Sequence, residues 1–164
     1  MSTAPWGLVR LAAAAALAIS MLPATAAGTV EVSWLQPERY SDAGRSIVDR
    51  ERTMTSLGEY LGQLGRQLPD GQTLKIEVLD VNLAGEVEPH GWDEVRILRG
   101  RADWPQMTVR YTLQAGGQTL KAGEAHLSDL NYFAFQRGLR MGHGDLAYEK
   151  RMVDRWFSDH FAGH

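Results

Sequence analysis

The stretch Thr73–Ala84 constrains the fold of this sequence more than any other. Apolar side chains alternate with polar ones up to Val78 and alternate again from Leu79 onward, so the phase changes between these two residues. Either a β-bulge redirects a strand at this point, or the strand is central in a sheet and buried on both faces. Without a bulge, Asp80 and Asn82 would share a face with the first apolar set.

Three further strands are expected around this one. Residues 29–35 alternate in the manner of a half-buried strand, and residues 107–114 and 118–127 form a hairpin closed by Gly116-Gly117. Residues 36–49 and 85–105 are loop-like, with a possible short strand at 94–99. The turn predicts four cross-strand pairs, namely Leu113 with Leu120, Tyr111 with Ala122, Val109 with Glu124 and Met107 with His126.

Two helices complete the pattern. An apolar stripe with helical spacing predicts a first helix over residues 49–68. It contains Gly58, Gly62 and Gly65, which together cost roughly 2–3 kcal/mol relative to alanine. We therefore expect close approach of this helix to a sheet. A second helix begins with Asp145 as its N-cap and buries a broad face that includes Trp156 and Phe157.

The order of elements predicts an α+β fold. We expect a two-layer sandwich, in which a mixed sheet of three to five strands carries two helices on one face. The first strand–helix–strand unit would be parallel. The sequence has 164 residues, so residues 28–164 are expected to form a single α+β domain.

Residues 1–27 have the pattern of a secretory signal peptide. Arg10 precedes an apolar run that ends before Pro23, and small residues then supply a cleavage site near Ala26-Ala27. The apolar run covers only ~18 Å as a helix, less than the ~30 Å core of a bilayer. We therefore expect cleavage, export to the periplasm or the cell exterior, and no membrane span in the mature chain.

Composition excludes several classes of function. The sequence has no cysteine, so disulfides, thiolate metal sites and cysteine nucleophiles are excluded. A net charge of -3 argues against nucleic acid as a partner. Phosphate-binding glycine loops, a serine nucleophile elbow and zinc-binding histidine pairs are missing from the sequence. We expect no cofactor and no metal.

Asp80 and Asn82 are the first candidates for a ligand site, because polar groups on an apolar strand need partners. They would orient a polar ligand or hold a divalent cation, with Arg96 and Arg110 as further ligand-binding residues. The structural alternative is that Asp80 lies at the bulge, where it caps backbone N–H groups or pairs with one of the two arginines.

Glu149 is the second candidate, because it lies near the centre of the apolar face of the second helix. As a general acid or base it would work with His126 or His160. The alternative is a buried Glu–Arg ion pair. His126 with Asp129, and His143 with Asp145, are weaker candidates for a hydrolytic or metal site. The basic residues 137, 140, 150, 151 and 155 fit a solvated helix face or a docking site for an acidic envelope component.

Three stretches resemble one family of exported proteobacterial proteins, domain of unknown function 3016. They are Asp80-Val-Asn-Leu-Ala-Gly85, Leu127-Ser-Asp-Leu-Asn-Tyr132 and Leu146-Ala-Tyr-Glu-Lys150, the last followed by Trp156-Phe157. The resemblance covers nearly all of the expected mature chain. It implies an exported bacterial protein and no activity, cofactor or site residue.

These features favour a non-enzymatic binding module of the cell envelope. Its sheet face or a helix-flanked groove would bind another envelope protein or a small polar ligand. The alternative is a small hydrolase or metal-dependent enzyme that uses Asp80, Asn82, His126 and Glu149. A structural oligomer is a third possibility, favoured by an exposed edge strand at Thr29–Leu35. The sequence leaves the oligomeric state open.

Overall fold

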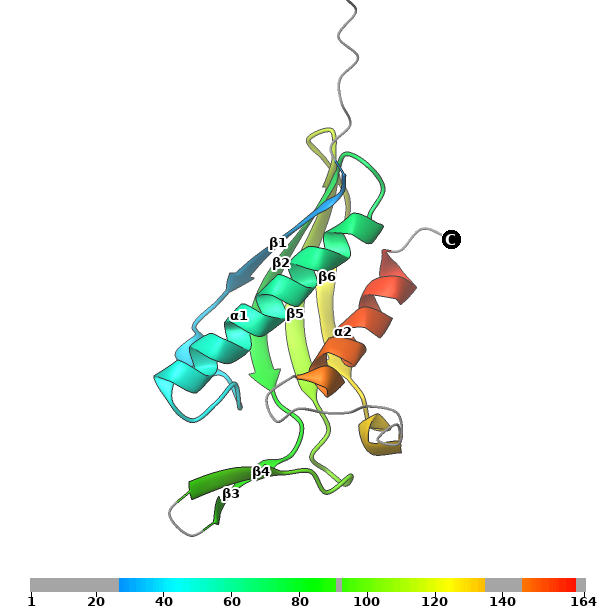
Figure 1. Cartoon of the computed structure of the whole chain (residues 1–164). Helices are drawn as coiled ribbons and strands as arrows, with labels where there is room; N and C mark the ends of the chain where they lie inside the picture. Colours follow the sequence, from blue (N-terminus) through cyan, green and yellow to red (C-terminus); the bar gives the residue numbers. More distant parts are fainter. Residues whose placement is uncertain (1–26, 91–92, 135–145, 162–164) are drawn as a thin grey trace, which may run out of the picture.

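A mixed four-stranded sheet with two helices on one face forms the body of the protein (Figure 1). The structure is a computed structural model that describes residues 27–90, 93–134 and 146–161. The strand order is β1-β2-β5-β6; β1 and β2 are parallel, and the other neighbours are antiparallel. The elements of this body are β1 (Thr29–Trp34), α1 (Ile47–Leu64), β2 (Gln72–Asn82), β5 (Gln106–Ala115), β6 (Gln118–Ser128) and α2 (Ala147–His160). The predicted α+β sandwich is confirmed.

The phase change in β2 comes from a bulge. The register between β2 and β5 shifts between Val78 and Asp80, which confirms one of the two explanations offered by the sequence. Val78 and Val81 are both fully buried beneath the helices. Asp80 and Asn82 therefore lie on the opposite, open face of the sheet.

The predicted pairing of β5 with β6 is wrong by one residue. Leu113 pairs with Lys121, and Met107 pairs with Leu127, because the ladder is irregular between Leu113 and Gln114. A slip of one residue moves every side chain of a strand to the other face. His126 consequently pairs with Thr108 on the open face.

Helix α1 begins and ends earlier than predicted. Its N-cap is Ser46, whose hydroxyl accepts the backbone N–H of Asp49 at 3.0 Å. The last expected turn is instead a 3-10 helix, η2 (Gly65–Gln67). The sequence predicted that the three glycines let this helix lie close to the sheet. The prediction is confirmed at Gly65, where an added Cβ would lie 2.9 Å from the backbone nitrogen of Val30. At Gly62 it is wrong, because an added Cβ would meet nothing within 4 Å.

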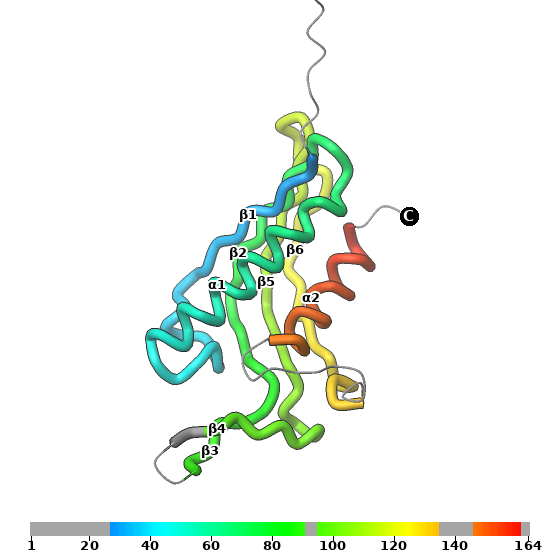
Figure 2. Tube along the Cα trace, in the orientation of Figure 1, coloured from blue at the N-terminus to red at the C-terminus, as the bar shows by residue number. Residues whose placement is uncertain are grey.

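Two segments expected to be loops are more ordered than predicted. Residues 85–105 contain a hairpin of β3 (Glu86–His90) and β4 (Asp93–Ile97), which lies beyond the end of β2 and away from both helices (Figure 2). Residues 36–49 contain the 3-10 helix η1 (Pro37–Arg39), and Asp42 forms a parallel bridge with Asn82. Ala43 is buried, so this segment is partly core.

The core lies between the sheet and the helices. Helix α2 buries its apolar face there, and Phe157 and Val153 are fully buried. The residue before α2 is Leu146, with positive φ and no side-chain cap. The expected cap Asp145 lies outside the described residues, as do His143, Arg137, Arg140 and the predicted signal peptide up to residue 26.

Candidate functional site

Asp80 binds a neighbouring loop and neither of its predicted arginine partners. One carboxylate oxygen accepts the backbone N–H of Ser41 at 2.7 Å, and the other accepts the Ser41 hydroxyl at 2.8 Å. Arg110 instead pairs with Glu77 and Glu124 on the open face of the sheet, at 3.1 and 3.5 Å. Asp80 thus caps a backbone group beside the bulge, where it holds the segment that precedes α1.

Arg96 anchors the β3–β4 hairpin to the body. Its guanidinium lies 2.8 Å from a carboxylate oxygen of Asp42 and donates to the carbonyl oxygens of Ala84 and Gly85 at 3.4 and 3.0 Å. An open pocket of about 500 Å³ adjoins this junction, and Asn82 and Asp42 are among its lining residues. Two of the predicted ligand-binding residues therefore contact Asp42: Asn82 through a β-bridge and Arg96 through an ion pair. Arg110 lies apart from them, on the open face of the sheet.

Glu149 is buried, as its place on the apolar face predicts, but its partner is a backbone group. The side chain is 3 % exposed and accepts the N–H of Ala84 at 2.7 Å. Burial raises the pKa of the Glu149 carboxyl, while that hydrogen bond and the nearby charge of Arg96 act in the opposite direction. Glu149 therefore forms neither the buried ion pair with arginine nor the pair with His160 that the sequence analysis considered. His160 lies at the far end of α2, where its Nδ1 is 2.8 Å from the carbonyl oxygen of Trp156.

The three proposed catalytic side chains do not meet. His126 is exposed on the open face of β6, and its Nδ1 is 3.1 Å from the hydroxyl of Thr108 on β5. Asp80 pairs with Thr108 from the other side, on β2. Glu149 belongs to α2, which covers the opposite face of the sheet. His126 and Asp129 form no dyad, since Asp129 is buried and bound to Arg151 at 2.5 Å.

The stretches that carry the family resemblance converge at the start of α2. Arg151 joins Asp129 to the carbonyl oxygen of Tyr132, which it reaches at 3.1 Å. The Tyr132 ring lies edge-on to Tyr148, with 4.9 Å between the ring centroids. Arg151 is therefore part of a structural network, contrary to its predicted place on a solvated helix face, and Arg155 lies 3.6 Å from the same carboxylate.

Asp103 extends this network toward the hairpin. Burial acts to raise the pKa of the Asp103 carboxyl, but hydrogen bonds from the N–H groups of Arg99 and Arg101 and from the Tyr132 hydroxyl lower it overall. Burial and the hydrogen bond to Asp103 raise the pKa of Tyr132 to about 12. The polar groups around the start of α2 are thus engaged with one another.

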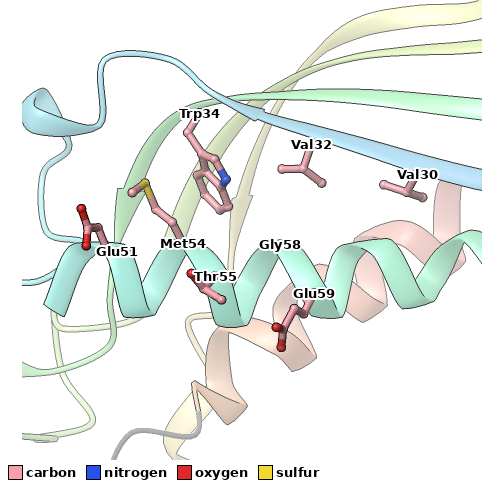
Figure 3. A pocket seen from close by; sticks show the side chains of 8 residues that line it. All are labelled: Val30, Val32, Trp34, Glu51, Met54, Thr55, Gly58 and Glu59. Carbon is pink, nitrogen blue, oxygen red and sulfur yellow. The ribbon is translucent and has the colours of Figure 1, made fainter. Parts of the chain in front are cut away.

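A groove between β1 and α1 has a different character (Figure 3). It measures about 580 Å³, and the side chains of Trp34, Val32 and Val30 point from β1 toward the helix. Met54 points back toward the Trp34 ring, and Gly58 leaves space beneath it. Glu51, Thr55 and Glu59 complete the lining. We name this surface the β1–α1 groove.

The sequence indicated the edge strand but not these lining residues. Trp34 and Met54 have the spacing of core residues, and only their place on an edge strand and the adjoining helix leaves them half-exposed. Gly58 is the one residue whose type could have indicated the groove from the sequence. Its added Cβ would lie 3.6 Å from the Trp34 ring, which is ordinary contact, so no close approach of helix and strand explains the glycine.

Two findings bear on other classes of function. Within residues 27–90, 93–134 and 146–161, no group of three or more histidine, aspartate or glutamate side chains is placed to hold a metal ion. No helix in the same ranges combines the length and the hydrophobicity that crossing a membrane requires.

Comparison with known proteins identifies a family. The model of a family described as "Protein of unknown function (DUF3016)" matches residues 28–159. No curated protein and no solved structure matches the chain.

Proposed function

We propose that this chain, which belongs to the DUF3016 family of proteins of unknown function, is an exported binding module without catalysis of its own. Its binding surface would be the β1–α1 groove, and its partner another protein of the cell envelope. One observation carries the proposal. The groove offers apolar side chains, two carboxylates and a strand edge that the fold leaves unused.

The alternative of a hydrolase or metal-dependent enzyme has weaker support. It needs Asp80, His126 and Glu149 around one cleft, yet the sheet separates His126 from Glu149. Asp80 holds Ser41, and Glu149 holds the N–H of Ala84. Groups already engaged in folding contacts are poorly placed for acid–base work.

Export is the second part of the proposal, and it rests on the signal-like pattern of residues 1–27. The mass of the mature protein, recovered from the periplasmic fraction of its native cells, tests it. We expect a chain that begins near Ala27. A full-length chain that stays in the cytoplasmic fraction would contradict export while leaving the groove as a binding surface.

Photo-crosslinking in intact cells tests the binding role. A crosslinking amino acid at Thr55, which lines the groove, should capture the same partner in repeated experiments. The matched control places it at Ala122, an exposed position of β6 that pairs with Thr112 on the open face. Equal capture from both positions, or none from Thr55, would contradict the proposal.

A further inference from the structure

We infer that the β1–α1 groove binds an extended segment of its protein partner as an added strand on β1. The segment would carry a basic, an apolar and a basic side chain at alternate positions, all facing α1. This inference rests on the proposed function, because it gives the partner chemistry of the same groove.

The backbone of β1 is prepared for such an addition. β1 is an edge strand of the described sheet, with β2 on one side only. The N–H of Leu35 donates to the carbonyl oxygen of Val78 at 3.0 Å, so the groups of odd-numbered residues face β2. By alternation, the N–H and C=O groups of Val32 and Trp34 point away from the sheet. Strand addition uses edge groups of this kind.

The floor of the groove suits one apolar side chain at its centre. Trp34 and Met54 approach from strand and helix, and the missing side chain of Gly58 leaves room between them. The groove is closed at one end, where Gly65 packs on the first residues of β1. Toward the other end, at the start of α1, Ile47 and Val48 are 70 % and 61 % exposed and offer further apolar surface.

The charges of the groove select the flanking side chains. Its lining includes Glu51 and Glu59 but no basic residue, and neither carboxylate has an ion-pair partner within the described part of the chain. The two residues are eight positions apart on α1, which is about 12 Å along the helix axis. Positions four apart on a strand are about 13 Å apart and face the same way. Two basic side chains at that spacing therefore match the two carboxylates along the helix axis, and long lysine side chains can also span the rotation of about 80° that eight helical residues put between Glu51 and Glu59.

A second copy of this chain fits the groove less well. Its own β1 segment, residues 28–36, contains no lysine or arginine, and it carries Glu31. An edge-to-edge dimer through β1 would also bring two acidic grooves together, and like charges repel. Charge complementarity thus favours a basic segment of another protein.

Isothermal titration with synthetic peptides tests the inference on the mature protein. The probe is acetyl-Ser-Lys-Thr-Leu-Thr-Lys-Ser-amide, and the control is acetyl-Ser-Leu-Lys-Lys-Thr-Thr-Ser-amide, which has the same composition and charge. We expect saturable binding of the probe with a dissociation constant below about 1 mM. The control should bind at least tenfold more weakly. Equal binding of both peptides, or no binding of the probe, would overturn the inference.

A matched pair of leucine variants localises the binding. Gly58→Leu fills the groove and should weaken probe binding at least tenfold, whereas Ala122→Leu adds a leucine on the open face of the sheet, opposite the helices, and should leave probe binding within twofold. The double variant Glu51→Gln/Glu59→Gln should also weaken binding tenfold or more, and Asp159→Asn on α2 should not. Loss of binding in Ala122→Leu or Asp159→Asn equal to that in the groove variants would contradict the assignment.

The outcomes distinguish failure of this inference from failure of the proposed function. Crosslinking from Thr55 together with failure of the probe peptide leaves a binding module whose partner has different chemistry, so this inference alone falls. Sedimentation of the mature protein tests whether a second copy of this chain occupies the groove. A dimer that Gly58→Leu dissociates would show that the groove holds a second copy, and it would overturn the inference.

Discussion

The start of α2 and the β1–α1 groove use charged residues in opposite ways. Around α2, Asp129 and Glu149 are 1 % and 3 % exposed, and each has a short contact with a guanidinium or a backbone N–H. Along the groove, Glu51 and Glu59 are exposed and have no such contacts among the described residues. Buried charges need partners, and surface charges do not. The first region thus holds the fold together, and the second is available to a partner.

This difference also separates the stretches that carry the family resemblance from the proposed binding surface. The three stretches that carry the resemblance meet around α2, where Tyr132 and Arg151 join different parts of the chain. None of them reaches the groove. Sequence motifs of this protein therefore mark contacts that stabilise its fold, and the proposed binding surface lies among groups that those contacts leave unused.

Substitution of Asp129 should have the largest effect on stability. Asp129→Ala removes the buried carboxylate that Arg151 and Arg155 both contact, and breaking such a buried ion pair costs about 3–5 kcal/mol. Glu59→Ala in the groove should change the free energy of unfolding by less than about 0.5 kcal/mol. Urea denaturation measures both. Similar losses in the two variants would remove the distinction between the regions.

Gly65→Ala should cause the second-largest loss of stability. The new methyl group would lie 2.9 Å from the backbone nitrogen of Val30 and 3.0 Å from the carbonyl oxygen of Gly28, so helix and strand must separate. Overpacking of this kind costs about 1–3 kcal/mol. Thermal unfolding measures the loss. An unchanged midpoint would mean that η2 does not close the groove against β1.

Glu149→Gln should have an effect that depends on pH. Burial raises the pKa of the Glu149 carboxyl in the folded state, so the wild-type side chain favours folding while it is protonated and loses that advantage as pH rises through the raised pKa. Glutamine still offers an acceptor to the N–H of Ala84. The free energies of unfolding of the wild type and the variant, measured between pH 4 and pH 8, should therefore be equal at the acidic end. At higher pH the variant should be the more stable protein. A constant difference across this range would refute the role given to burial.

Gly58→Ala should have a small effect of the opposite sign. An added Cβ would meet only the Trp34 ring, at 3.6 Å, and alanine favours the helical backbone over glycine. We expect a gain of about 0.5–1 kcal/mol, measured by the same thermal unfolding. Gly62→Ala, which meets nothing within 4 Å, provides the reference for helix propensity alone. A loss of stability specific to Gly58→Ala would show that the floor of the groove has no spare room.

Local patterns predicted most of the fold. The phase change at Val78 allowed two explanations, one of which was the bulge. Gly116-Gly117 indicated the turn, and apolar spacing predicted the buried face of α2. The pairing of β5 with β6 was missed because an irregularity at Leu113 and Gln114 leaves no mark in the alternation. The possible strand at residues 94–99 corresponds to β4, but its partner β3 was missed, because the hairpin lies outside the main sheet and lacks a strong apolar pattern.

The candidate site was harder to predict for a different reason. Sequence reasoning ranks polar residues in apolar surroundings, and in this protein Asp80 and Glu149 bind backbone groups of the fold itself. Trp34 and Met54 look like core residues until the strand order places β1 at the edge of the sheet. The groove is a property of tertiary arrangement, with Gly58 as its only local sign.

Amide hydrogen exchange tests the central claim most directly, because it compares the two regions in one measurement. In the free protein, the N–H of Ala84, bound to Glu149, should exchange slowly, and those of Val32 and Trp34 should exchange fast. Addition of acetyl-Ser-Lys-Thr-Leu-Thr-Lys-Ser-amide should slow exchange at Val32 and Trp34 and leave Ala84 unchanged. Slow exchange of Val32 and Trp34 without the peptide, or no change with it, would contradict a free strand edge that receives a partner.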